Sequence, residues 1–189
     1  MIRLATEADA PALTQALARA FHHDPVAAWS LPSARRRPGQ LARFYRERLR
    51  TLMADELVFC DEERRGAALW AAPDRWHVAP TELARMRILT RRTPVFLVGA
   101  RRVDRAHPEE PHFYLHVLGV EPSAQGNGLG SRLMAPMLER CDRDGVPAYL
   151  ESSRERNVAF YERHGFRVTG EVDMPLGGPR LWLMWRDPR

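Results

Sequence analysis

The chain has 189 residues, of which 44% are hydrophobic, and this suits one globular domain with its own core. It holds no run of eighteen apolar residues, and its first residues lack the pattern of a signal peptide, so we expect a cytoplasmic protein with no membrane partner. The net charge of +5 comes from 29 basic residues that are all arginine and are scattered, which argues against a nucleic-acid-binding surface.

The first half of the chain alternates between strands and amphipathic helices. The letters IRLA predict a first strand, and Thr6 with Asp9 forms a capping-box pattern ahead of a helix. The HHDP corner ends that helix, and a second helix is predicted from about residue 40 to 53. ELVFCD and GAALWAAP then predict a hairpin, and residues 80–105 predict a helical stretch broken near Pro94.

The second half continues the same alternation. The predicted elements are a strand at 113–120, a helix at 129–144, a strand at 147–151, a helix at 156–164 and strands at 166–173 and 179–186. This order indicates an α/β protein with a mixed sheet and helices on its faces. Cys60 and Cys141 lie far apart without a CxxC spacing, so we expect two reduced thiols and no metal site.

Gly126, Gly128 and Gly130 fall within five residues, between a predicted strand and a predicted helix. A dinucleotide fingerprint would need a third glycine where Ser131 stands, and a P-loop would need a lysine, which this chain lacks. A glycine turn before a helix leaves backbone N–H groups free beside the positive end of the helix dipole. The turn therefore favours binding of a pyrophosphate.

A second segment, ERNVAFYERHGF, places Asn157 and Tyr161 on one face of a short helix. With it the sequence resembles the GNAT superfamily of acetyl-CoA-dependent N-acetyltransferases, because QGNGLG matches the pyrophosphate loop of that family and ERNVAFYERHGF matches its N-x-x-x-Y/F-x-x-x-G-F segment. The resemblance implies one GNAT domain over residues 1–189. Its sheet would be central, mixed and largely antiparallel, flanked by helices, with splayed strands at the cofactor site.

The resemblance also implies acetyl-CoA as the cofactor. A bulge would splay the strand before the glycine turn, and the backbone N–H of Leu118 would polarise the thioester carbonyl. Asn157 would bind the pantetheine arm, and Tyr161 would be the general acid that protonates the leaving thiolate. The implied cofactor-binding residues are Leu118, Gly119, Val120, Gln125, Gly126, Asn127, Gly128, Leu129, Gly130, Ser131, Asn157 and Tyr161.

An amine acceptor is largely protonated at neutral pH, so a group must take its proton. Glu151, at the end of the strand AYLE, is the first candidate for this base, and His116 is the second. Strand alternation would put His116 on the same face as Leu118 and Val120, where it could simply pack.

The acceptor implied by the resemblance is a small-molecule amine. Nearly the whole chain resembles family members that acetylate aminonucleoside antibiotics, but FHHDPVAAWSLP and the stretch from about 80 to 105 match poorly. Two alternatives stay open, namely acetylation of peptide or protein N-termini and a catalytically silent acyl-CoA sensor, and the protein would be a monomer or a homodimer. The expected acceptor-binding residues are His23, Asp24, Trp29, Trp70, His116 and Glu151.

Overall fold

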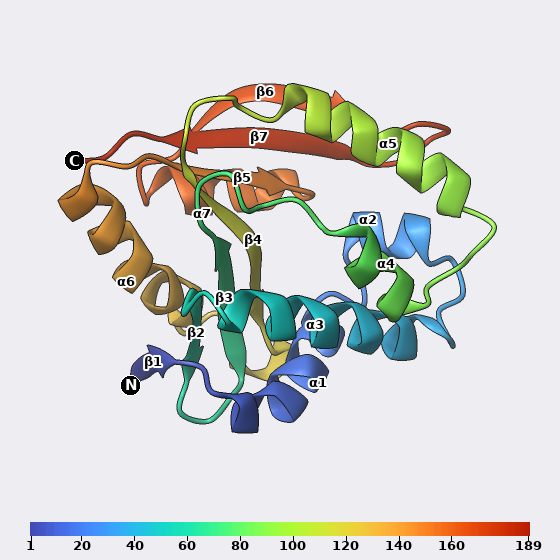
Figure 1. Ribbon diagram of the computed structural model, residues 1–189, viewed down its shortest axis with the longest axis horizontal. Helices are drawn as coiled ribbons and strands as arrows, with labels where there is room; N and C mark the ends of the chain where they lie inside the picture. Colours follow the sequence, from blue (N-terminus) through green and yellow to red (C-terminus); the bar gives the residue numbers. More distant parts are fainter.

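The computed structural model describes residues 1–189, which form a seven-stranded sheet in the order β1-β2-β3-β4-β5-β7-β6 (Figure 1). Only the pairing of β4 with β5 is parallel. The expected mixed, largely antiparallel sheet is therefore confirmed. The strands are β1 (Ile2–Leu4), β2 (Val58–Asp61), β3 (Gly66–Ala71), β4 (Phe113–Val120), β5 (Ala148–Ser152), β6 (Arg167–Asp173) and β7 (Arg180–Arg186).

Helices cover both faces of this sheet. The α-helices are α1 (Ala10–Ala20), α2 (Pro25–Ser30), α3 (Arg37–Met53), α4 (Pro80–Met86), α5 (Thr93–Ala106), α6 (Leu129–Asp144) and α7 (Val158–Glu162). Alternate residues of β3 join two separate hydrophobic clusters, one built with α1 and α3 and the other with α6 and α7. Figure 1 shows α5 lying along β6 and β7, and no residue of α5 belongs to either cluster. No helix has the length and apolar character that a bilayer span requires.

The start of the chain folds as its sequence predicts. The carboxylate of Asp9 accepts hydrogen bonds from the backbone N–H and the hydroxyl of Thr6, both at 2.9 Å. It also pairs with Arg3 at 2.7 Å, and this hydrogen-bonded cation holds the pKa of Asp9 far below its usual range. The predicted capping box is present and fixes where the first helix begins.

The structure differs from the sequence prediction at two places. The HHDP corner ends the first helix as predicted, but it is followed at once by α2, which the sequence analysis missed. This helix begins there because the Asp24 carboxylate caps the N–H groups of Val26 and Ala27 and because Pro25 occupies the first turn. Pro94 does not break a helix, because it sits in the first turn of α5. The break lies earlier, where Arg87 adopts a left-handed conformation and ends α4.

Candidate active site

A bulge in β4 creates the site. The register with β3 pairs Leu69 with Val117 and Trp70 with Leu115, so His116 is an extra residue on β4. On its other edge β4 pairs with β5 only at Phe113 and Tyr114. Beyond Tyr114 the two parallel strands separate, as the resemblance to the family implied, and the edge of β4 between Leu115 and Val120 faces the gap.

The bulge also reverses which backbone N–H groups face that gap. The N–H of Phe113 donates to Pro147 O, on the β5 side, whereas the N–H of Glu121 donates to Arg65 O, on the β3 side. In a regular strand the N–H groups of residues 113 and 121 would point to the same edge, because the two residues are an even number of positions apart. Here they point to opposite edges, so the bulge has shifted the alternation by one residue. Counting back from Glu121, the N–H of Leu118 points away from β3 and into the gap.

The glycine turn follows β4 and leads into α6. Gly126 and Gly128 have φ angles of +82° and +68°, a region that side chains with a Cβ rarely adopt. Gly128 caps the N-terminus of α6, and the side-chain amide of Gln125 donates to Val120 O at 2.9 Å. The turn is thus held against the end of β4, with the N-terminus of a sixteen-residue helix facing the gap.

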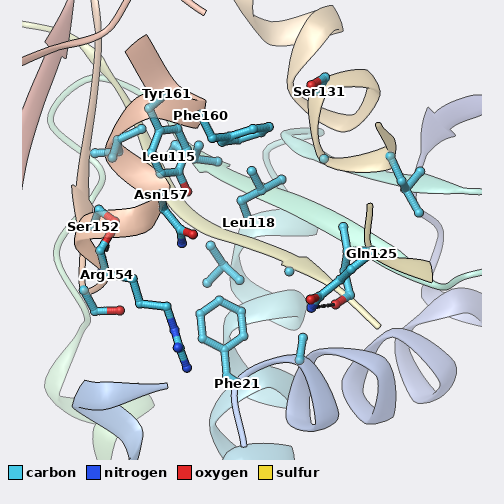
Figure 2. Close-up of a pocket in the computed structure, with 18 of the residues that line it drawn as sticks. Phe21, Leu115, Leu118, Gln125, Ser131, Ser152, Arg154, Asn157, Phe160 and Tyr161 are labelled. Carbon is cyan, nitrogen blue, oxygen red and sulfur yellow. Dashed lines mark hydrogen bonds between the residues drawn. The ribbon is translucent and has the colours of Figure 1, made fainter. Parts of the chain in front are cut away.

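A cavity of about 560 Å³ fills the gap between β4 and β5. Every residue expected at the cofactor lines it except Asn127, whose backbone oxygen accepts a hydrogen bond from Arg132. In Figure 2, Asn157 and Tyr161 lie at one side of the cavity and Gln125 at the other, with Leu118 between them and Phe21 across from Leu118. Three segments distant in sequence therefore meet around one space.

Three arginines at this cavity were missed by the sequence analysis. Arg154, Arg156 and Arg163 come from the end of β5 and the segment that holds α7, and all three line the cavity. They suit a ligand that carries phosphates, since a planar guanidinium can donate two hydrogen bonds to one phosphate. The arginine-rich composition hid this signal, because arginines are spread along the whole chain.

Tyr161 is buried in the cluster formed with α6, and it lines the cavity. Burial, with a smaller effect from the charge of Asp24, raises the pKa of its phenol above the usual value. The side chain therefore stays protonated at neutral pH and can act only as a proton donor.

Glu151, next to the last residue of β5, also lines the cavity. Its Oε2 accepts a hydrogen bond from the hydroxyl of Tyr114, and its Oε1 lies 3.5 Å from Nδ1 of His107. The side chain of Glu151 is only 9% exposed. A carboxylate in such a site is well placed to take a proton from a ligand in the cavity.

His116 lies on the other face of the sheet from the one expected. Because it is the bulged residue, its ring lies 6.3 Å from the ring of Phe44 on α3, whereas Leu118 and Val120 pack with the α6 cluster. His116 lines the cavity, and neither ring nitrogen has a hydrogen-bond partner within the protein. Burial, with a smaller effect from Arg48, holds the pKa of His116 well below its ordinary value, so the ring is a weak base.

Three of the expected acceptor-binding residues do not line the cavity. The prediction that Trp70 contacts the acceptor is wrong, because this side chain is fully buried in the core between β3 and α6. His23 is exposed outside the cavity, where its ring packs edge-on against His22 and its backbone oxygen accepts a hydrogen bond from Arg154. Trp29 packs near Phe96 of α5, with the ring centroids 6.4 Å apart.

Asp24 does line the cavity, but its carboxylate is already occupied. One oxygen caps α2, and the other accepts a hydrogen bond from the hydroxyl of Ser153. The residue thus ties α2 to the end of β5 and shapes the cavity wall.

Comparison with known proteins places this geometry in a family. The model of the acetyltransferase (GNAT) family matches residues 46–166, which is more than half of the chain. The chain belongs to the GNAT family. Members of this family take an acetyl group from acetyl-CoA, and the open edge of β4, the glycine turn and the arginines suit that donor.

Individual relatives support the same assignment. An uncharacterized N-acetyltransferase of Schizosaccharomyces pombe is 40% identical over 49% of this GNAT chain and 38% of its own length. A mycothiol acetyltransferase of Brachybacterium faecium is 37% identical over 39% of this chain and 24% of its own length. This chain thus spans well under half of the curated relatives that it matches.

One solved structure is similar over its full length. A Corynebacterium glutamicum protein described as histone acetyltransferase HPA2 and related acetyltransferase is 27% identical, with a TM-score of 0.70 over 100% of this chain and 96% of its own. The GNAT fold therefore extends over residues outside the matched family model as well.

We expect Gly128→Val to abolish the rise in melting temperature that acetyl-CoA gives to the wild-type protein. A ligand that binds only the folded state raises its melting temperature by mass action. Valine at a φ of +68° strains the turn and puts a side chain at the N-terminus of α6. Thermal unfolding with and without acetyl-CoA measures the shift separately from any loss of stability. A shift equal to that of the wild type would remove the turn from the cofactor site.

Proposed function

We propose that this GNAT protein is an N-acetyltransferase that moves the acetyl group of acetyl-CoA to the amine of a small molecule by direct transfer in a ternary complex. The observation that carries the proposal is the single cavity that gathers the open edge of β4, Tyr161 and Glu151. A donor of protons, a carboxylate and free backbone N–H groups are the groups that such a transfer needs. One GNAT domain over residues 1–189, as a monomer or a homodimer, would suffice for it.

Each group has a distinct role in the proposed reaction. When bound, acetyl-CoA supplies an acetyl group on a thioester, which an amine can attack. The N–H of Leu118 donates to the carbonyl oxygen, where negative charge grows during attack. Glu151 accepts a proton from the amine, and Tyr161 donates one toward the sulfur. Asn157 and the glycine turn hold the rest of the cofactor.

Two resemblances favour a small molecule as the acceptor. The sequence resembles puromycin N-acetyltransferase, an enzyme of the same family, and this resemblance favours an aminonucleoside-type antibiotic or a related metabolite. A mycothiol acetyltransferase is among the relatives, and its name also points to a small molecule. The segments that match the first resemblance poorly, around α2 and from α4 to α5, would set a different selectivity.

A panel of amines should reveal the acceptor, with aminonucleosides tested first. We expect at least one neutral or weakly basic small amine to be acetylated, measured as release of the free thiol of CoA. Peptides with free N-termini form the second arm of the panel. Much faster turnover of peptides than of any small amine would make the protein a peptide or protein N-terminal acetyltransferase. Acetyl-CoA binding without turnover of any amine would make it a sensor.

A further inference from the structure

Two buried histidines stand behind Glu151, on the segment that joins α5 to β4. Nδ1 of His107 lies 3.5 Å from Oε1 of Glu151. Nε2 of His107 lies 3.0 Å from Nε2 of His112, and Nδ1 of His112 lies 2.6 Å from the backbone oxygen of Glu110. His107 and His112 are 8% and 3% exposed, whereas Glu110 is exposed. The contacts form a continuous line from the cavity to the surface.

The backbone oxygen at the outer end fixes the direction of this line. A carbonyl oxygen only accepts hydrogen bonds, so Nδ1 of His112 carries a proton. In neutral His112 the other nitrogen must then accept, so Nε2 of His107 is the donor. Neutral His107 is left with a lone pair on Nδ1, and that lone pair faces Glu151.

Other groups hold this arrangement in place. The ring of His107 stacks on Trp76, with centroids 3.6 Å apart, and burial lowers the pKa of His112 below its ordinary value. The stacking keeps the ring of His107 fixed, and the lowered pKa keeps His112 neutral at rest. The titratable or charged groups near the line are Glu151 and Tyr149 of β5, Tyr114 and His116 of β4, Arg48 of α3, and Asp74 before α4.

We propose that His107 and His112 relay the proton that Glu151 takes from the acceptor amine out to solvent. Oε1 of Glu151 gives the proton to Nδ1 of His107. The proton on Nε2 of His107 passes to Nε2 of His112, which becomes an imidazolium. His112 then loses its Nδ1 proton to water beside Glu110, which leaves His107 protonated on Nδ1 and His112 protonated on Nε2. Once the product has left, the rings regain their first tautomers by exchanging protons with water in the open cavity and at the surface.

The relay balances the proposed reaction, on which it rests. An ammonium acceptor carries three N–H protons and the amide product keeps one. Of the other two, one goes from Tyr161 to the thiolate, with the phenol reprotonated from the amine side, and one leaves through the histidines. A sealed site without such a path would hold that second proton beside Glu151 and slow the next turnover.

The tautomers can be tested without any acceptor. Nitrogen NMR of the isotopically labelled protein distinguishes protonated from unprotonated ring nitrogens. We expect neutral His107 to carry its proton on Nε2 and neutral His112 to carry its proton on Nδ1. The opposite tautomer at either ring would break the line and overturn the proposal, whatever the protein acetylates.

The relay itself is tested by His107→Gln and His112→Gln. We expect each to lower kcat on the order of 10-fold with the KM for acetyl-CoA unchanged, since the loss is in proton transfer and not in binding. Small buffer bases such as imidazole should restore kcat in the variants as their concentration rises, but should not accelerate the wild type. His77→Gln is the matched control, because the exposed His77 also stacks on Trp76 but does not contact Glu151.

The outcomes separate the relay from the proposed function. If the wild type acetylates an amine and both variants match it in kcat and in buffer dependence, the relay is wrong and the function stands. If the variants lose activity but buffer restores none of it, while the acetyl-CoA melting shift stays normal, the histidines only position Glu151 and the relay is again wrong. If the wild type acetylates no amine, the function fails, and the relay fails with it even where the tautomers agree.

Discussion

Tyr161→Phe is expected to lower kcat on the order of 10²-fold while leaving the affinity for acetyl-CoA unchanged, the scale of a lost general acid. Phenylalanine keeps the ring that packs in the α6 cluster and removes only the hydroxyl. Because burial raises the pKa of Tyr161, the phenol stays protonated to higher pH than an ordinary tyrosine, so its loss should lower kcat across the neutral pH range. Steady-state kinetics and the acetyl-CoA melting shift measure the two effects separately.

Phe160→Leu provides a comparison for Tyr161→Phe. Phe160 comes from the same helix and lines the same cavity, but it has no proton to donate. This substitution should change the KM for acetyl-CoA more than kcat. If Tyr161→Phe instead abolished the melting shift, the tyrosine would be a cofactor contact, and the general-acid role would have to be withdrawn.

Glu151→Gln should cause the second large loss, a fall of about 10²-fold in kcat/KM for the acceptor, the lower end of the range for a lost general base. A base works only when it is deprotonated, so kcat/KM of the wild type should fall at low pH. This fall is the acidic limb of the pH profile, and the variant should lose it. The amide keeps the size of the side chain and can still accept from Tyr114. The measurement is kcat/KM against pH for both proteins.

His116→Ala decides between the two candidate bases. Because burial holds the pKa of His116 well below its ordinary value, a limb caused by this histidine would lie below about pH 6.5. Loss of the limb in His116→Ala, with Glu151→Gln unaffected, would make the histidine the base. A limb unchanged in both variants would belong to the amine itself, and water would then take the proton.

The order of strands and helices could be predicted from the sequence because hydrophobic periodicity and turn residues are local signals. β4 and α6 have the bounds that their patterns predict, and the glycine turn between them was assigned from Gly126 and Gly128. α2 was missed although Asp24 followed by Pro25 is a helix-start signal, because the segment is only six residues long and has little periodicity.

The acceptor side of the site could not be predicted, because it depends on contacts between distant segments. Nothing local to Trp70 shows that α6 will bury it, and nothing local to His116 shows that a bulge will turn it toward α3. The line from Glu151 through His107 and His112 joins residues separated by about forty positions. Only the packing of the segment before β4 against β5 brings them together.

Because of the bulge at His116, the number of residues in β4 matters to the site as much as the side chains of this strand do. A deletion of one residue between Tyr114 and Val117 would restore unbroken pairing with β3 and would remove the bend that a bulge gives to its strand, so β4 would follow β5 beyond Tyr114 and the gap would narrow. An exchange of the side chain at His116 leaves the bend in place. Over evolution, this strand can therefore tolerate a new residue at the bulge, whereas the loss of a single codon there would close the gap and leave the sheet folded.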